Sequence, residues 1–409
     1  MRINSIARKL IGVEAIFVKD ISIVPNGLVF DLVPSWHRPR CGICGEKCPG
    51  YDTSAESRLW RHLPLGGVVI WLRYKIRRVE CPVHRVVTEK VPWAVHDDRF
   101  TREMTEMIAY LTQRMDKTAV CTLMGINWRT VNAVVIRVVK ERLDPKRFDG
   151  LYKIGLDEIS YRRHHKYLTV VIDHAMRRVV WAADGKSGET LDLFFDKLGP
   201  DRGKMVTDVT MDMSQAYIET VRKRIPGAQI VFDRFHVQKL AGNAVDEVRR
   251  REYGLCENEE DARFIKHSRW ALLKNPWNLT RKEGAKLREV AWMNKRIFRA
   301  YLLRETLAEA LEQTTLGRAR KRLDEWIGWA SRSSLAPFVK VARTIRKYKD
   351  GILAYIETHL TNGLVEGLNN RIRLITRRAY GFHSHESLIS MVYLCCGGIK
   401  LNPSLPQPT

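Results

Sequence analysis

Residues 152–158 read Tyr-Lys-Ile-Gly-Leu-Asp-Glu, a short run that favours a β-strand and ends in two acids. Runs of the same kind recur downstream at 167–173, 178–182, 204–211 and 229–232. Two stretches with helical spacing separate the later runs, at 188–198 and 214–224. Three strands in succession, followed by alternating helices and strands, predict a mixed sheet with helices packed on it.

The segments on either side of this region differ in character. The first 95 residues hold strand-like runs separated by turns such as Pro25-Asn26-Gly27, which indicates a β-rich module. Residues 101–145 have helical spacing, and residues 237–350 contain almost no strand signal. The chain therefore reads as an α+β and α/β multidomain protein. Its expected parts are a β-rich module at 1–95, a helical module at 96–148, a mixed domain at 149–237 and 356–400, and an all-helical insertion at 238–355.

The chain is strongly basic. Lys and Arg number 70 against 46 Asp and Glu, which gives a formal charge of +24 and an isoelectric point near 9.8. An excess of this size favours a polyanionic partner, most often nucleic acid, although a ribosome-like or membrane-surface protein has the same balance. No apolar run reaches the ~18 residues of a membrane-spanning helix, so we expect no membrane partner.

Two short motifs in the first module have metal-ligand spacing. Each places two residues between its ligands, and the ligands are Cys41, Cys44, Cys81 and His84. Three thiolates and one imidazole suit a tetrahedral structural Zn²⁺. Cys48 and His37 are rival ligands, and His84 is the least secure of the four. The alternative is a set of small buried residues without metal.

The helical module contains a candidate helix-turn-helix. Residues 118–124 and the helix from Trp128 onward flank the turn Gly125-Ile126-Asn127. We expect Ala119 and Leu123 to pack inward. The second helix is then expected to expose the residues of a DNA-reading surface, Trp128, Arg129, Asn132 and Arg137. An ordinary helical hairpin is the alternative.

Two acids end strands of the predicted mixed sheet. Asp157 ends the first strand and Asp212 follows the fourth. If those strands are neighbours, the two carboxylates meet and supply the hard oxygen ligands that Mg²⁺ or Mn²⁺ prefers. Two such ions would support phosphodiester chemistry.

Glu366 is the best candidate for a third acid. On a helix, Asn362, Glu366, Asn369 and Arg373 share one face, and packing alone explains such a polar stripe poorly. A solvated helix face is the alternative.

Other polar groups compete with these acids or assist them. Asp233 and His236 follow the fifth strand three residues apart, so both can face the same cleft. The weaker rivals are Asp173, Asp208 and Glu158. The candidate phosphate-binding residues are Arg249, Arg250, Arg251, Arg371 and Arg373.

These motifs together resemble the ISL-three (ISL3) family of bacterial insertion-sequence transposases. The resemblance rests on the two Cys/His motifs, the helix-turn-helix, Gly155-Leu156-Asp157-Glu158, Asp233-Arg234-Phe235-His236-Val237 and Asn362-Gly363-Leu364-Val365-Glu366-Gly367-Leu368-Asn369. It covers nearly the whole chain, and the segments at Asp233 and Glu366 are its most specific parts.

The resemblance implies a DDE transposase with a ribonuclease-H-like catalytic domain. Asp157, Asp212 and Glu366 match the family's metal-binding triad, and Asp233 with His236 matches its Asp-x-x-His element. Asp233 remains the reserve for the second acid. His84 departs from the pattern, because a second Cys is the more usual end of the motif.

The activity implied is cutting at the transposon ends and joining of the 3′-hydroxyl to target DNA, with Mg²⁺ or Mn²⁺ at the acids and a structural Zn²⁺. The implied partners are double-stranded DNA and a second copy of the chain, in the cytoplasm of a bacterium and associated with the nucleoid. A purely hydrolytic nuclease or resolvase, or a non-catalytic DNA-binding regulator, is the competing interpretation.

Overall fold

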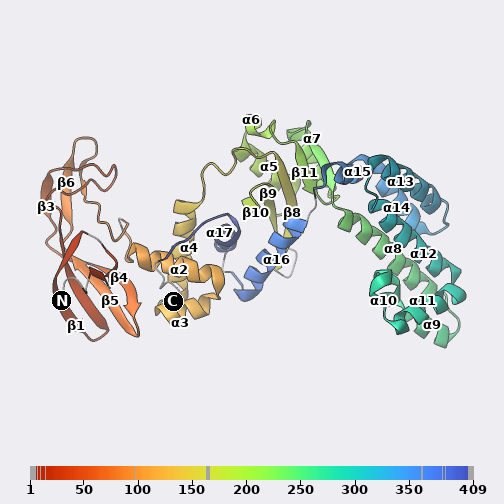
Figure 1. Ribbon diagram of the computed structural model, residues 1–409, viewed down its shortest axis with the longest axis horizontal. Helices are drawn as coiled ribbons and strands as arrows, with labels where there is room; N and C mark the ends of the chain where they lie inside the picture. Colours follow the sequence, from red (N-terminus) through yellow and green to blue (C-terminus); the bar gives the residue numbers. More distant parts are fainter. Residues whose placement is uncertain are drawn as a thin grey trace. The chain divides into compact units, whose positions relative to one another are not determined.

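The computed structural model describes residues 6, 8–9, 11–13, 15–95, 97–162, 166–360, 363–379, 381–382 and 384–403. It divides into two compact units, and Figure 1 gives the element labels. Residues 1–144 and 374–409 form unit 1, and residues 145–373 form unit 2. Asn362, one of the four residues of the predicted polar stripe, lies outside the described residues.

Unit 1 begins with two small sheets. The first has the strand order β1-β2-β5-β4, and the second has the order β3-β6-β7. The strands are β1 (Ile16–Val24), β2 (Gly27–Pro34), β3 (Gly50–Thr53), β4 (Arg58–Leu65), β5 (Val68–Tyr74), β6 (Arg77–Cys81) and β7 (Arg85–Thr88). The four-stranded sheet buries one apolar face, on which Trp60 and Leu72 are almost fully inaccessible to solvent. The predicted β-rich character of this segment is confirmed.

Three helices follow the sheets in unit 1: α2 (Arg102–Arg114), α3 (Lys117–Met124) and α4 (Trp128–Arg142). Asp116 and Asn127 cap α3 and α4 with their side chains. Gly125 ends α3 in the left-handed region at a φ of 57°, where a residue with a side chain is strained. These local signals produce the predicted helix-turn-helix. Leu123 is 58% exposed, so the expectation that it packs inward is wrong.

The last described helix, α17 (His385–Cys396), belongs to unit 1 and packs on α4 and α2. Nine of its residues are buried. The Gln113 side chain donates a hydrogen bond of 2.6 Å to the carbonyl oxygen of Leu394. The sequence predicts a mixed domain that includes residues 356–400, and in the structure residues 374–409 are part of compact unit 1. The apolar residues of this helix indicate that it is buried but carry no signal for the elements that bury it.

Unit 2 is built on a five-stranded mixed sheet of order β10-β9-β8-β11-β12. The strands are β8 (Lys153–Arg162), β9 (Lys166–Asp173), β10 (Arg178–Asp184), β11 (Asp208–Met211) and β12 (Gln229–Phe232). β9 is antiparallel to both β8 and β10, whereas β8, β11 and β12 run parallel. The predicted mixed sheet is therefore present, although the fourth strand begins only at Asp208.

Helices α5 (Gly188–Leu198), α6 (Pro200–Gly203) and α7 (Gln215–Arg224) connect the strands of this sheet. A helical segment follows β12. It consists of α8 (Arg234–Gly254), α9 (Glu259–Lys266), α10 (Arg269–Leu273), η1 (Pro276–Asn278), α11 (Arg281–Met293), α12 (Lys295–Leu311), α13 (Leu316–Ser331), α14 (Ala336–Lys347) and α15 (Lys349–Thr358). One continuous apolar core joins this segment to the sheet.

Helix α16 (Gly363–Arg378) lies against β8. A methyl group on Gly155 would come within 2.6 Å of the Val365 side chain, so only glycine allows this close approach. Gly155 and Asp157 lie two residues apart on the strand and therefore share the face that α16 covers. The approach of α16 at Gly155 thus brings the helix close to Asp157.

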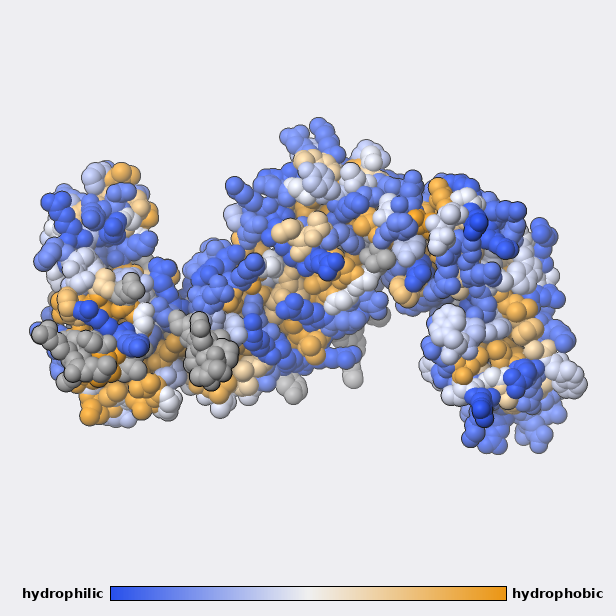
Figure 2. Space-filling model, viewed as in Figure 1, coloured by the Kyte–Doolittle hydropathy of each residue, from blue (hydrophilic) through white to orange (hydrophobic). Residues whose placement is uncertain are grey.

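No single described helix is long and apolar enough to cross a membrane. The bent pair α3 and α4 passes that test only by length and composition. Figure 2 shows hydrophilic side chains over most of the visible surface of each unit.

Candidate functional site

Three acids lie side by side on neighbouring parallel strands of unit 2. Asp212 and Asp233 directly follow β11 and β12, whereas Asp157 lies in the middle of β8, which continues to Arg162, so the expectation that Asp157 ends the first strand is wrong. The register between β8 and β11, continued by two residues, brings Asp212 opposite Asp157. The register between β11 and β12 brings Asp233 beside Asp212. Because β11 and β12 end level with Asp157, the three carboxyl groups gather where those two strands end.

These acids line one cavity of about 420 Å³. Its lining residues are Asp157, Glu158, Tyr167, Asp212, Asp233, Phe235, His236, Lys239, Glu366, Asn369 and Arg373. Every catalytic residue expected from the sequence is in this set. Glu158, a weaker rival, also lines it, whereas Asp173 and Asp208 do not.

Helix α16 supplies the side of the cavity that faces the strand ends. Glu366, Asn369 and Arg373 recur at helical spacing along it and all line the cavity. The side-chain amide of Asn369 donates a hydrogen bond to Asp157. Asn369 is 1% exposed, and its Oδ1 has no hydrogen-bond partner in the described structure. A buried amide oxygen without a partner beside carboxylates is a free ligand atom.

The cavity concentrates negative charge and partly removes it from water. Burial raises the pKa of Asp157, and the nearby Asp212 carboxylate raises it further. Burial is also the main cause of the raised pKa of Glu158. The hydrogen bond to Asp233, 3.2 Å from Nδ1, raises the pKa of His236 and favours its protonated form. The acids therefore need a cation to stay ionised at low cost.

The donor set fits a hard divalent cation. Carboxylate oxygens and a free amide oxygen are the ligands that Mg²⁺ and Mn²⁺ prefer, and no described thiol lines the cavity. Asp157, Asp212 and Glu366 could hold such an ion, with Asn369 beside them.

Sequence reasoning missed three residues of this cavity: Tyr167, Phe235 and Lys239. Phe235 and Lys239 had a usable signal. Both lie within one turn of His236 at the start of α8, where neighbouring residues share the same opening. Tyr167 had none, because it comes from β9 and only the strand pairing brings it to the site.

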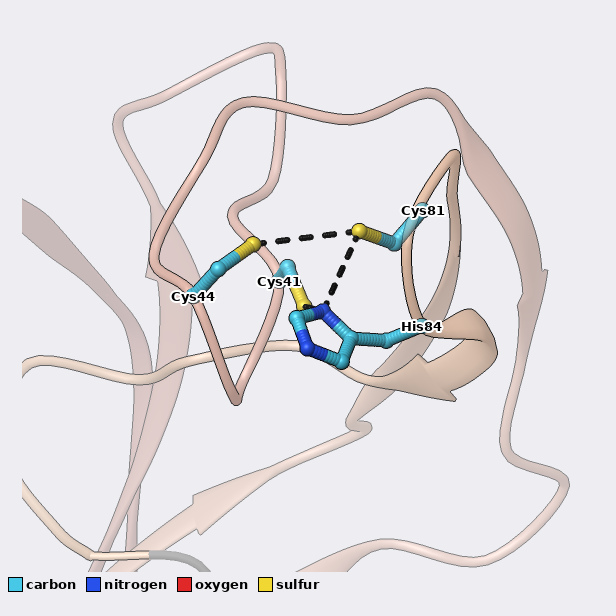
Figure 3. A group of neighbouring side chains, drawn as sticks. All are labelled: Cys41, Cys44, Cys81 and His84. Carbon is cyan, nitrogen blue, oxygen red and sulfur yellow. Dashed lines mark hydrogen bonds between the residues drawn. The ribbon is translucent and has the colours of Figure 1, made fainter.

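The second site is a Cys₃His cluster in the first module. Figure 3 shows Cys41 and Cys44 on one loop and Cys81 and His84 around a tight turn, with all four side chains converging. Their ligand atoms lie within 4.8 Å of one another. The Sγ atoms of Cys44 and Cys81 are 3.8 Å apart, and His84 Nδ1 lies 3.6 Å from Cys81 Sγ and 3.7 Å from Cys41 Sγ.

These separations match the edges of a zinc tetrahedron. Zn–S bonds of about 2.3 Å and a Zn–N bond of about 2.0 Å give S···S edges of ~3.8 Å and S···N edges of ~3.5 Å. Backbone N–H groups, chiefly that of His84, lower the pKa of the Cys81 thiol to about 7, which favours the thiolate that a metal requires.

The rival ligands fall outside the cluster. The buried Cys48 thiol lies near that of Cys81 but is not among the four converging ligand atoms, and it donates to the carbonyl oxygen of Glu46. His37 is exposed. The structure therefore brings together the four residues expected from the sequence, with His84 as the fourth.

Comparisons with known protein families match all three segments. A family described as a transposase matches residues 154–392, the helix-turn-helix domain of transposase family ISL3 matches residues 89–139, and the zinc-finger of the IS204, IS1001, IS1096 and IS1165 transposases matches residues 37–84. The chain belongs to the ISL3 family of transposases.

Named relatives agree with this membership. The transposase for insertion sequence element IS1557 of Mycobacterium tuberculosis is 41% identical over 393 residues, which cover 90% of this chain and 87% of that protein. The transposase for insertion sequence element IS1001 of Bordetella parapertussis is 30% identical over 351 residues, covering 85% and 86%. This ISL3 transposase therefore has a helix-turn-helix DNA-binding domain and a zinc ribbon with a Cys₃His site that supports a structural Zn²⁺.

The second helix of this ISL3 transposase's helix-turn-helix does not expose all the residues of the predicted DNA-reading surface. Only Arg129 of the four expected residues is exposed. Asn132 donates to the Ser387 hydroxyl at 2.9 Å and accepts from a buried lysine at 3.0 Å. Arg137 forms an ion pair of 2.7 Å with Asp98. Trp128 is half-buried.

The expected basic run on α8 contains one buried arginine and two exposed ones. Arg249 is 8% exposed and forms an ion pair with Asp246 at 2.8 Å, so it is structural. Arg250 and Arg251 are exposed, each also within ion-pair distance of an acid one turn away. On α16, Arg371 and Arg373 are exposed, and Arg373 lines the acidic cavity.

Proposed function

We propose that this ISL3 transposase is a magnesium-dependent DDE enzyme whose triad is Asp157, Asp212 and Glu366. It binds the terminal inverted repeats of its element, cuts at the ends and joins the 3′-hydroxyl to target DNA. The single observation that carries the proposal is the one cavity that the side chains of all three acids line.

The topology of unit 2 supports a ribonuclease-H-like catalytic domain. Taken in chain order, its strands are arranged 3-2-1-4-5, the second antiparallel to the first and the fourth and fifth parallel to it. The acids lie on the first strand, just after the fourth, and on a late helix. In this proposal, α8–α15 form an insertion between β12 and α16.

The register favours Asp212 over Asp233 as the second acid. Asp212 lies opposite Asp157 across one strand pair, whereas Asp233 lies one strand further away. Asp233 is also committed elsewhere, because it caps α8 and bonds to His236. We assign the Asp233–His236 pair an assisting role in which protonated His236 faces the negative phosphates.

When bound, a pair of divalent cations activates the attacking oxygen and stabilises the leaving oxygen of an in-line displacement. The chain's own groups prepare the site. Asn369 fixes the orientation of the Asp157 carboxylate. Lys239 and Arg373, which also line the cavity, supply positive charge for a phosphodiester. Water and a 3′-hydroxyl can both serve as the nucleophile in this geometry.

The test is a cleavage and strand-joining assay with transposon-end DNA and Mg²⁺. Asp157→Asn, Asp212→Asn and Glu366→Gln should abolish both reactions and leave end binding largely intact, because phosphate contacts do not depend on these acids. If Asp212→Asn stays active and Asp233→Asn loses activity, Asp233 is the second acid of the triad in place of Asp212.

Two further outcomes decide between the functions. Cleavage without joining would identify a hydrolytic nuclease or resolvase. Binding without either reaction in the wild type would identify a regulator. End binding that depends on a second copy of the chain would support the expected homodimer, which sedimentation of the protein–DNA complex measures.

A further inference from the structure

A cavity beside the zinc site gathers four basic side chains around apolar ones. It has a volume of about 310 Å³ and is lined by Ala15, Trp36, Arg38, Arg40, Lys47, Lys90 and Pro92. We call it the ribbon cavity. No acidic side chain is among its described lining residues.

The four cations of the ribbon cavity are uncompensated in the described part of the chain. Arg38, Lys47 and Lys90 form no hydrogen bond or ion pair with any described side chain, and Arg40 donates only to the carbonyl oxygen of Gly45, at 3.0 Å. Other arginines of the same module have carboxylate partners: Arg73 with Asp31, Arg77 with Glu89, and Arg78 with Asp52. The ribbon cavity therefore gathers four positive charges that have no carboxylate partner among the described residues.

The zinc motifs fix the spacing of these cations. Arg40 directly precedes the zinc ligand Cys41, and its backbone pairs with that of Lys47. The backbone N–H of Lys90 donates to the carbonyl oxygen of Arg40 at 2.8 Å. Three of the four side chains thus project from backbone that the metal site holds together.

An aromatic ring adds a rigid apolar wall. The ring of Trp36 packs on that of the fully buried Trp93, with ring centroids 6.3 Å apart. Cationic side chains beside an aromatic ring are a combination that binds nucleic-acid strands. The cations pair with the phosphates, and the ring contacts a sugar or base. A protein carboxylate would use the cations but not the apolar wall.

We propose that the ribbon cavity binds the sugar–phosphate backbone of DNA, as a contact separate from the helix-turn-helix. The proposal rests on the proposed function in one respect: the DNA is taken to be the substrate of the acidic cavity. The ribbon cavity anchors the DNA without reading its sequence, because phosphate contacts carry no sequence information.

A lysine footprint tests the contact in the unmodified full-length protein. The protein is treated with an amine-acylating reagent with and without transposon-end duplex, and acylation is measured by peptide mass spectrometry. We expect Lys47 and Lys90 to be protected severalfold by DNA, whereas Lys19 and Lys75, exposed lysines of the same module outside the cavity, stay reactive. Equal protection by inorganic phosphate at the same ionic strength would show a small-anion site and overturn the proposal.

A matched pair of double variants tests the energetics. Arg38→Gln with Lys47→Gln removes two charges from the ribbon cavity, and Lys19→Gln with Lys75→Gln removes two from elsewhere in the module. The zinc content of each is measured first. The cavity variant should reduce the salt slope of DNA binding by about 1–2, which corresponds to the loss of one or two phosphate contacts.

The cavity variant should weaken binding to end DNA and to scrambled DNA by the same factor. The control variant should change the salt slope by less than half of the change seen in the cavity variant. Equal slopes in the two variants would overturn the proposal. Failure of the proposed function is seen separately, because the DNA contact is measured without metal or cleavage.

Discussion

The side-chain amide of Asn369 donates a hydrogen bond to the carboxylate of Asp157, although the two residues are 212 positions apart in the chain. This bond connects α16 to the first strand of the sheet. The same helix carries Glu366 one turn earlier, so the bond fixes the distance between two acids of the proposed triad. Asn369 is therefore a positioning residue.

Replacing Asn369 by Leu should separate this positioning role from a role in folding. Leu removes the hydrogen bond and the free amide oxygen but keeps a side chain of similar size. We expect turnover to fall at least tenfold, a loss of about 1.4 kcal/mol of transition-state stabilisation. The Mg²⁺ concentration needed for half-maximal rate should rise, while end binding stays unchanged. Asn243→Leu, the same substitution at an exposed position of α8 outside the cavity lining, is the control. An unchanged metal dependence would show that Asn369 only supports the helix.

The core of this site was predictable because its signals are local. Asp212 and Asp233 each follow a short strand, and parallel strands present their carboxyl ends at one edge. Asp157 lies within a run of strand-forming residues, although the strand continues beyond it to Arg162. Glu366 and Asn369 share a helix face through their spacing alone. The zinc ligands were likewise predictable from two short motifs.

The misassigned features depend on contacts between distant segments. Asn132 has the spacing of an exposed residue, yet it bonds to Ser387, which is 255 positions away. Arg249 reads as part of a basic run, but a carboxylate one turn earlier on α8 neutralises it. The position of α17 could not be predicted either. Its apolar residues indicate that the helix is buried, but they do not indicate which helices it packs on.

The zinc site gives a prediction about the fourth ligand. Cys81→Ser should remove the zinc and unfold the first ~95 residues, since a structural zinc contributes folding free energy. His84→Cys should retain about one zinc per chain, because four thiolates also form a tetrahedral site. Cys48→Ser should retain it as well, because that thiol bonds to a carbonyl oxygen outside the cluster. Metal analysis with limited proteolysis measures both effects, and loss of zinc in Cys48→Ser alone would reverse the assignment.

The helix-turn-helix gives a prediction that separates base reading from packing. Arg129 is exposed near the start of α4, where side chains reach base edges. Arg129→Ala should reduce discrimination between end and scrambled DNA by about 1–3 kcal/mol without changing stability. Asn132→Ala should instead lower the melting temperature, because it breaks the bond to Ser387 in α17. If Arg129→Ala weakens binding to end DNA and to scrambled DNA by the same factor, α4 does not read the sequence.

A buried lysine gives a prediction about pH. Lys117 is 3% exposed, its Nζ donates to Asn132 at 3.0 Å, and it lies over the rings of Trp128 and Phe382. Burial lowers its pKa from 10.5 to about 8. Between these two values the unfolded chain binds more protons than the folded one, so the free energy of unfolding should rise with pH across this window. The shift corresponds to about 3 kcal/mol at most.

Lys117→Met isolates this contribution because methionine has a similar length and no titrating group. The difference in unfolding free energy between wild type and Lys117→Met, measured by urea denaturation at several pH values, should shift in favour of the wild type from pH 8 to 10.5. Lys140→Met, which removes an exposed lysine from α4, should show no such trend. If the unfolding free energies of Lys117→Met and Lys140→Met depend on pH in the same way, the Lys117 ammonium is exposed to water in solution. Its hydrogen bond to Asn132 would then contribute little to the packing of α3 on α4.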